Sequence, residues 1–230
     1  MVQIQIIEKL FSYETVVYSY LLLPVLALVF KNKMLKNIFL TFFIYGITCF
    51  LLLYFFSEIP KTLRGAYFTF YTFFEYSVFA VLFYYNITNK FIKTSILIAS
   101  ACFLIFQSVF LFTAEIQSLD SVPIGIETIL IFIYIFCFFY ESSKLTKDNY
   151  IYNQYGFWIA VGILVYLGGS FFFYILIDHL DKSEVDSFGN LTYIAEIIKN
   201  ILFSVAILIY ARQPKKADKK PPTVPYLDMI

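Results

Sequence analysis

Four ionisable side chains interrupt apolar stretches of this sequence, and they are the residues best suited to chemistry. Glu75, Glu127, Glu196 and Lys199 each lie inside a long apolar run. Insertion scales put the cost of a charged side chain at the centre of a membrane helix at about 2.5–3.5 kcal/mol, so such residues mostly face a bundle interior and mark a ligand site or an ion pathway. We therefore take these four residues as the start of a candidate site.

Helical spacing adds polar neighbours to these residues. Asn200 adjoins Lys199, one helical turn after Glu196, and Tyr71 and Thr72 stand one turn before the acid of their own segment. Residues three or four apart share a face of a helix. The predicted ligand or ion site comprises Tyr71, Thr72, Glu75, Glu127, Glu196, Lys199 and Asn200.

Each ionisable residue also has a purely structural interpretation. Glu196 and Lys199, three residues apart, could neutralise each other on one helix. Glu75 could be a neutral carboxyl that hydrogen-bonds to a Tyr or Thr of a neighbouring helix, and Glu127 could lie shallow enough to reach a membrane interface. The sequence leaves these alternatives open.

The composition indicates that the chain resides in lipid. Of its 230 residues 60% are apolar, 22% aromatic and only 14% charged, and the mean hydropathy is +0.77; soluble domains are about 45–50% apolar. The net charge of +1 gives no field that would attract nucleic acid. The three cysteines lie in apolar runs, and no metal-ligand spacing is present, so we expect no metal and no cofactor.

Seven segments are long and apolar enough to cross a bilayer as helices, which takes about 17–25 residues. We predict an all-α, seven-helix transmembrane bundle over residues 1–213, followed by a basic, proline-containing tail at 214–230. The predicted spans are Glu14–Phe30, Ile38–Ser57, Ala66–Asn86, Thr94–Thr113, Ile124–Tyr140, Gly156–Ile177 and Thr192–Ala211.

The distribution of Lys and Arg predicts the orientation. Alternate connections carry twelve cations on one side and four on the other, and the remaining one, Lys199, lies within the last span. The positive-inside rule then places the N-terminus outside and the C-terminus in the cytoplasm, as a multi-pass protein of the inner membrane. In this orientation the three glutamates lie at outer to central depth, and we expect them to form one polar cluster if they face one another.

Two features predict local packing. Pro24 lies inside the first span and should kink it, because proline leaves a carbonyl without its helical partner. Gly162 and Gly169 lie on one helix and should let a neighbouring backbone approach closely.

Three stretches, YTFFEYSVFAVLFYYN, FWIAVGILVYLGGSFFF and IIKNILFSVAILIY, resemble small stand-alone bacterial seven-helix membrane proteins that have no assigned activity. The resemblance implies a seven-helix fold and no chemistry. Microbial rhodopsins are similar to this chain in length and orientation. They also have a carboxylate in the third helix and a Lys in the seventh, and Glu75 and Lys199 match these positions. Rhodopsin pockets are walled by several Trp, whereas this chain has only Trp158.

Three classes of function fit these observations. The first is a sensor or receptor-like module that binds a small apolar or amphipathic ligand in the outer half of the bundle and signals through a separate cytoplasmic protein. The second is a proton- or ion-coupled transporter that uses the intramembrane carboxylates. An enzyme is the third and the least supported, because no nucleophile–base pair or metal-ligand set is present in the spans.

Overall fold

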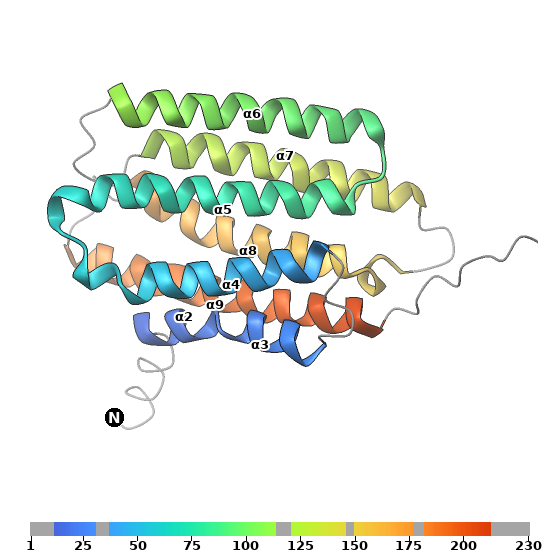
Figure 1. Cartoon of the computed structure of the whole chain (residues 1–230), viewed down its shortest axis with the longest axis horizontal. Coiled ribbons are helices and arrows are strands. Elements are labelled where there is room, and N and C mark those ends of the chain that lie inside the picture. The colour runs from blue at the N-terminus through green and yellow to red at the C-terminus, as the bar shows by residue number, and fades with distance from the viewer. Residues whose placement is uncertain (1–11, 31–36, 114–120, 146–149, 177–181, 213–230) are drawn as a thin grey trace, which may run out of the picture.

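The computed structural model describes residues 12–30, 37–113, 121–145, 150–176 and 182–212, and in these ranges the chain forms helices and no strand (Figure 1). The long helices run up and down beside one another, so that consecutive helices are antiparallel. Their bounds are α2 Tyr13–Ser19, α3 Leu22–Val29, α4 Asn37–Tyr54, α5 Arg64–Asn86, α6 Lys90–Thr113, α7 Ser121–Leu145, α8 Tyr155–Leu176 and α9 Lys182–Arg212.

All seven predicted segments form helices, with α2 and α3 together making the first. Among the described residues α4, α5, α6, α7 and α9 are long and apolar enough to cross a membrane, and the first segment and α8 are shorter apolar helices. The last predicted span, Thr192–Ala211, agrees with the apolar stretch Gly189–Arg212 of α9, and the helix itself begins earlier, at Lys182. Hydropathy marks only the part of a helix that suits hydrocarbon, and helix propensity lets polar residues extend the same helix beyond it.

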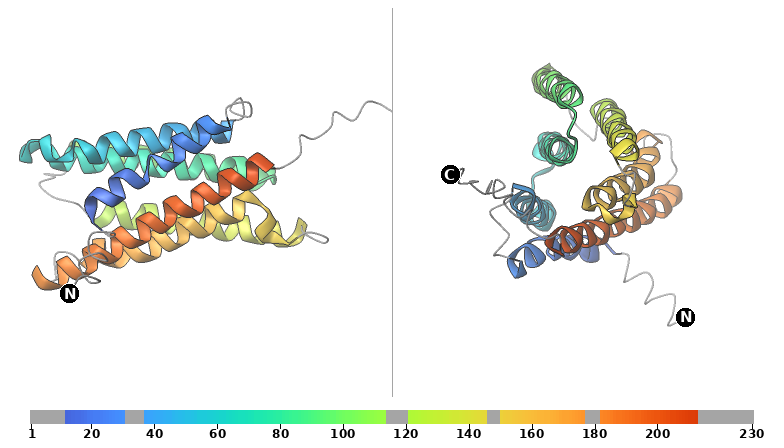
Figure 2. Two further views of the ribbon diagram at one scale, coloured as in Figure 1. Left: turned by 90° about the horizontal axis from the view of Figure 1, so that it is seen from below. Right: turned by 90° about the vertical axis from the view of Figure 1, so that its right-hand side faces the viewer.

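The surface of the bundle is rich in apolar side chains. On α6, which lies at one extreme of the bundle in the end-on view of Figure 2, Phe91, Ile98 and Ile105 are more than half exposed and stand seven residues apart on one face. Soluble monomers rarely expose such continuous apolar surface. These faces suit contact with hydrocarbon.

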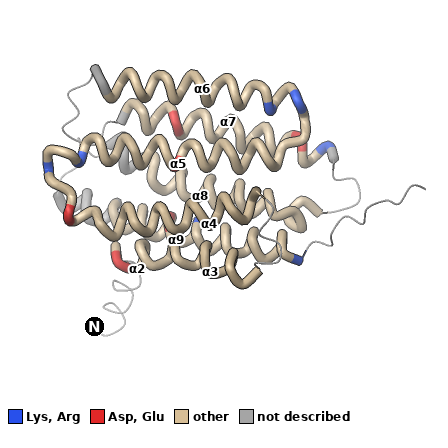
Figure 3. The backbone as a smooth tube through the Cα atoms, in the orientation of Figure 1, with Lys and Arg blue, Asp and Glu red and all other residues tan. Residues whose placement is uncertain are grey.

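Charged residues are concentrated toward the two ends of the bundle (Figure 3). Of the described residues, Lys90, Lys93, Glu141, Lys144 and Arg212 belong to one end, where α6 begins and α7 and α9 end. Thr88 and Asn89 donate their backbone N–H groups to the Glu141 carboxylate, at 2.7 Å for Thr88, which ties α7 to the turn between α5 and α6. His179 and the basic tail lie outside the described residues.

The break between α2 and α3 confirms the predicted kink. Pro24 cannot donate to the Tyr20 carbonyl four residues earlier, and that oxygen instead accepts the Leu23 amide at 3.3 Å. The Tyr20 carbonyl therefore finds its hydrogen-bond donor within the same helical segment. Gly46 of α4 packs against this break: a Cβ there would lie 2.5 Å from Pro24 Cδ and 2.8 Å from the Tyr20 oxygen.

The predicted close approach at the two α8 glycines is also present, because α8 and α9 lie side by side (Figure 2). A Cβ at Gly169 would lie 2.6 Å from the Ala195 Cβ, and one at Gly162 would lie 3.2 Å from the Phe203 ring. These contacts hold the Glu196–Lys199 stretch of α9 firmly against α8.

We predict that Gly46→Ala lowers the thermal stability of the purified protein by an amount typical of overpacking, about 1–3 kcal/mol. The added methyl group would collide with Pro24 and with backbone that cannot move aside easily. Gly168→Ala is the control, since a Cβ there meets nothing within 4 Å and alanine is the better helix former. Thermal unfolding in detergent measures both variants, and an unchanged melting temperature for Gly46→Ala would contradict the packing described here.

Candidate functional site

Lys199 lies at the centre of a polar cluster inside the bundle, and its side chain is fully buried. Its ammonium nitrogen is 3.2 Å from Glu75 Oε1, 2.9 Å from the Tyr45 hydroxyl and 3.1 Å from the Tyr20 hydroxyl. An ammonium group has three N–H donors. All three donors of Lys199 are therefore used, and the nitrogen also lies 3.7 Å from the centre of the Tyr166 ring, a favourable cation–π position.

Glu75 accepts hydrogen bonds on both carboxylate oxygens. The Tyr45 hydroxyl donates to Oε1 at 2.8 Å, beside Lys199, and the Tyr166 hydroxyl donates to Oε2 at 2.8 Å. These donors come from α4, α8 and α9, while Glu75 belongs to α5. The carboxylate is thus an ion-pair partner held by three helices, rather than the isolated hydrogen-bonded carboxyl that the sequence also allowed.

Glu196 belongs to the same network but is not paired directly with Lys199. Among the described residues the ion pair is Lys199 with Glu75, on another helix. Tyr20 bridges the two α9 side chains, because its hydroxyl accepts from Lys199 and donates to Glu196 Oε1. The Tyr71 hydroxyl lies 3.5 Å from the same oxygen. The alternative of a self-neutralising pair on one helix is therefore wrong, since the tyrosine occupies the space between the two groups.

Glu127 of α7 is 5% exposed and stands apart from this network. Its Oε1 is buried and has no hydrogen-bond partner among the described residues. A buried polar atom without a partner is costly and calls for an explanation. The Glu127 side chain lies inside the bundle, on the wall of the cavity described below, and its depth relative to a membrane interface stays a prediction.

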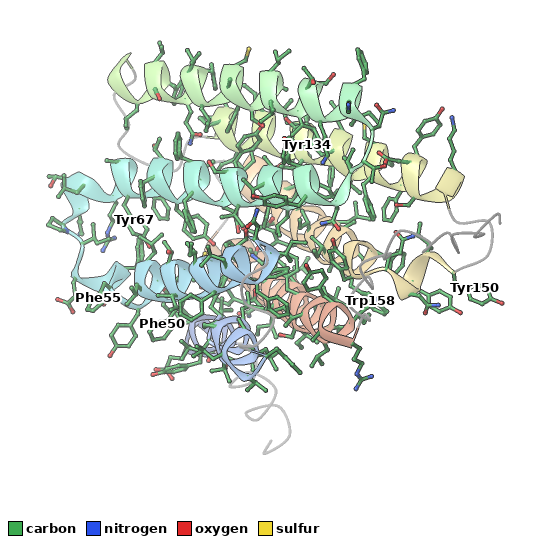
Figure 4. All side chains as sticks on the ribbon, turned by 45° about the vertical axis from the view of Figure 1, so that its right-hand side comes forward. Phe50, Phe55, Tyr67, Tyr134, Tyr150 and Trp158 are labelled. Carbon is green, nitrogen blue, oxygen red and sulfur yellow. The ribbon has the colours of Figure 1, made fainter. Side chains whose placement is uncertain are left out.

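A cavity of about 230 Å³ lies beside the cluster, at the end of the bundle where α2, α5 and α7 begin and α4 ends. Figure 4 shows the labelled Tyr67 at this end, between α5 and α4, with Trp158 and Tyr150 at the opposite end. The lining residues are Tyr13, Val16, Leu53, Phe56, Tyr67, Phe68, Tyr71, Thr72, Glu75, Ile124, Glu127, Gly189, Thr192, Tyr193 and Glu196.

Five of the seven predicted site residues line this cavity, namely Tyr71, Thr72, Glu75, Glu127 and Glu196. Lys199 lies behind the cavity, where it holds Glu75. Asn200 turns to α2, and its Nδ2 donates to Ser19 Oγ at 2.7 Å. Asn200 is therefore a helix-packing residue in this arrangement, and its prediction as a ligand contact has no support from the geometry.

The predicted site does not include the tyrosines that connect the charged groups. Tyr45 and Tyr166 lie on polar stripes of their segments, which indicates that they face inward but not that they contact the charged groups. The residue type of Tyr20 does not mark it as a site residue. It lies four residues before Pro24, and its carbonyl is the one that the proline leaves without a helical hydrogen bond. Only the packing shows that all three hydroxyls converge on two carboxylates and one ammonium group.

A second polar network lies between α5, α6 and α7. The Tyr76 hydroxyl is 2.9 Å from both Ser100 Oγ and the Tyr134 hydroxyl, and Gln107 Nε2 donates to the Thr69 carbonyl at 2.9 Å. Ser100 and Gln107 therefore hold the peripheral helix α6 to the bundle. They do not reach the cavity.

No group of three or more His, Cys, Asp and Glu side chains in the described ranges is placed to hold one metal ion. Comparisons of the chain with protein-family models, with curated proteins and with solved structures found no match. The interpretation of the site therefore depends on its own geometry.

We predict that Lys199→Met destabilises the protein by about 3–5 kcal/mol, the range seen when one partner of a buried ion pair is removed. The substitution leaves Glu75 buried without its counter-charge. Adding Glu75→Gln should restore much of the lost stability, since the double variant contains neither charge.

Glu196→Gln combined with Lys199→Met is the matched comparison, and it should recover less, because Glu196 reaches Lys199 only through Tyr20. Thermal unfolding of the single and double variants gives the two coupling energies. Equal coupling for both pairs would refute the assignment of Glu75 as the ion-pair partner.

Proposed function

We propose that this chain is a multi-pass membrane protein of the sensor type, with seven spans and an outer N-terminus. In this proposal a small amphipathic ligand binds in the cavity lined by Glu75, Glu127 and Glu196, and a separate cytoplasmic protein receives the signal. The cavity itself is the observation that carries the proposal, since it combines apolar walls with a few buried polar groups, as ligand sites do. We also propose that the chain shares the fold of the small bacterial seven-helix membrane proteins that it resembles.

The side chains packed in the interior favour a closed ligand-binding site over a continuous ion pathway through the bundle. Beyond Lys199, away from the cavity, the interior is occupied by Phe42, Phe79 and Phe203, which are fully or almost fully buried. The Phe42 and Phe203 rings are 5.3 Å apart, and those of Phe79 and Phe203 are 6.3 Å apart. Polar groups thus line one half of the bundle, and aromatic rings close the other half.

The hydrogen-bond network offers a route from the cavity to the helix break. Glu196 and Tyr71 line the cavity. The Glu196 carboxylate contacts two tyrosine hydroxyls, that of Tyr71 and that of Tyr20 at the junction of α2 and α3. A ligand that draws Glu196 away from Tyr20 would release the residue whose carbonyl faces Gly46 and Pro24. Small shifts at such a junction can become helix movements at the far end of a bundle.

A proton- or ion-coupled transporter is the second candidate, and Glu127 Oε1, which has no hydrogen-bond partner among the described residues, favours it. A buried acid with a free oxygen is a suitable site for a proton or an ion to enter. Flux measurements in proteoliposomes separate the two candidates: proton or ion movement that is lost in Glu127→Gln supports transport, and its absence supports sensing.

We predict the orientation from the cation-rich end of the bundle. A reporter fused after Ile230 should be active in the cytoplasm, and a reporter inserted between α4 and α5, near Ile59, should be active outside. The positive-inside rule is the physical reason. The reverse pattern would place the cavity on the cytoplasmic side and overturn the proposed direction of signalling.

We further predict that a thiol at Gly189 reacts from the outside. Gly189 lines the cavity, and a Cβ there meets nothing within 4 Å, so Gly189→Cys should fold normally. In a background with Cys102 and Cys137 replaced by Ala, a membrane-impermeant cationic methanethiosulfonate added to intact cells should modify it. Gly168→Cys, on the exposed face of α8, is the control and should stay unreacted in lipid. Equal reactivity of both cysteines, or none at Gly189→Cys, would argue against an open outer cavity.

A further inference from the structure

We propose that the ligand of this cavity is a small organic ammonium ion with an apolar body. The inference rests on the proposed ligand-binding function and deepens it by naming the chemical class. It follows from the acidic side chains of the cavity wall, from the unpartnered atoms on it and from its aromatic surface.

Three acidic side chains, Glu75, Glu127 and Glu196, line the cavity, and no Lys or Arg is among the described residues of its lining. Lys199 lies behind the wall with its three donors already used, and Arg64 lies 5.3 Å from the centre of the Phe56 ring. A second cation in the cavity would lower the cost of keeping these acids inside an apolar bundle.

Two buried polar atoms on the wall lack partners among the described residues. They are Glu127 Oε1, on α7, and the Tyr67 hydroxyl oxygen, on α5. Both atoms can accept a hydrogen bond, and a ligand ammonium group supplies several N–H donors. Glu127 is 5% exposed, so a ligand that reaches it must enter the bundle.

The remaining wall suits the apolar part of such a ligand. Tyr13, Phe56, Phe68 and Tyr193 present aromatic rings, and a cation over the face of an aromatic ring gains cation–π energy. The protein already uses this interaction at its centre, where Lys199 lies over the Tyr166 ring. A hydrated inorganic ion has no apolar surface to place against these rings, whereas an organic cation does.

The size of the cavity and the spacing of its acids disfavour a bare metal ion. The volume of about 230 Å³ is ample for a short arylalkyl amine. The acids are not grouped as the ligands of one metal ion within the described ranges. An organic cation can reach Glu127 with its nitrogen while its body fills the rest.

Three probes of similar shape and different charge test this inference: phenethylammonium, neutral 2-phenylethanol and anionic phenylacetate. Their binding to the full-length protein in lipid nanodiscs is measured by titration calorimetry at neutral pH, with empty nanodiscs as the blank. We expect phenethylammonium to bind about ten-fold or more tightly than the alcohol, the difference that one charge-assisted hydrogen bond supplies. Phenylacetate should not bind.

Glu127→Gln keeps the shape of the side chain and removes its charge, and it should weaken phenethylammonium binding about ten-fold while leaving 2-phenylethanol binding unchanged. Glu58→Gln is the matched control. It removes an exposed acid at the same end of the bundle, outside the cavity lining, and should change neither affinity.

The outcomes separate the ligand class from the proposed function. Equal or tighter binding of the alcohol or of phenylacetate would overturn the ammonium class and leave a ligand-binding cavity in place. Failure of all three probes would also overturn the class, while labelling of Gly189→Cys would still show an open cavity. Failure of both experiments would remove the proposed function itself. If Glu58→Gln and Glu127→Gln weakened phenethylammonium binding equally, general surface charge would account for the preference for the cation. That result would refute the site.

Discussion

The buried ammonium group of Lys199 is the constraint on which the interior of this bundle depends. A cation away from water must find its counter-charge and hydrogen-bond acceptors inside the protein. Its acceptors are Glu75 on α5, Tyr45 on α4 and Tyr20 at the end of α2, and Tyr166 of α8 lies over it. One side chain thus fixes the rotation of the helices around α9.

The break in the first helix helps to meet the same constraint. Tyr20 can bridge Lys199 and Glu196 because the chain turns at this residue, and the turn exists because Pro24 cannot complete the helical hydrogen bond. Gly46 leaves room for the turned backbone, since any larger residue would meet it. The kink, the glycine and the polar cluster are therefore parts of one arrangement that links the cavity to helix packing.

The two halves of the bundle interior have opposite characters. The cavity end contains three carboxylates and several tyrosines, and the other end is closed by packed phenylalanines. On the cavity wall, Glu127 Oε1 and the Tyr67 hydroxyl have no hydrogen-bond partner among the described residues. In the function that we propose, a molecule that enters the cavity is held at one end and acts on the rest of the bundle through the helices.

The sequence by itself determined the helices and the identity of the charged groups. Long apolar runs define helices by local composition, and isolated charges such as Glu75 and Lys199 are conspicuous because each is costly there. Which groups pair was decided only by the tertiary structure. Lys199 forms its ion pair with Glu75 of α5 and not with Glu196 of its own helix. The rotation of the helices and the position of Tyr20 decide this pairing. The cavity, too, arises between helices, and no single segment encodes the space that Glu127 faces.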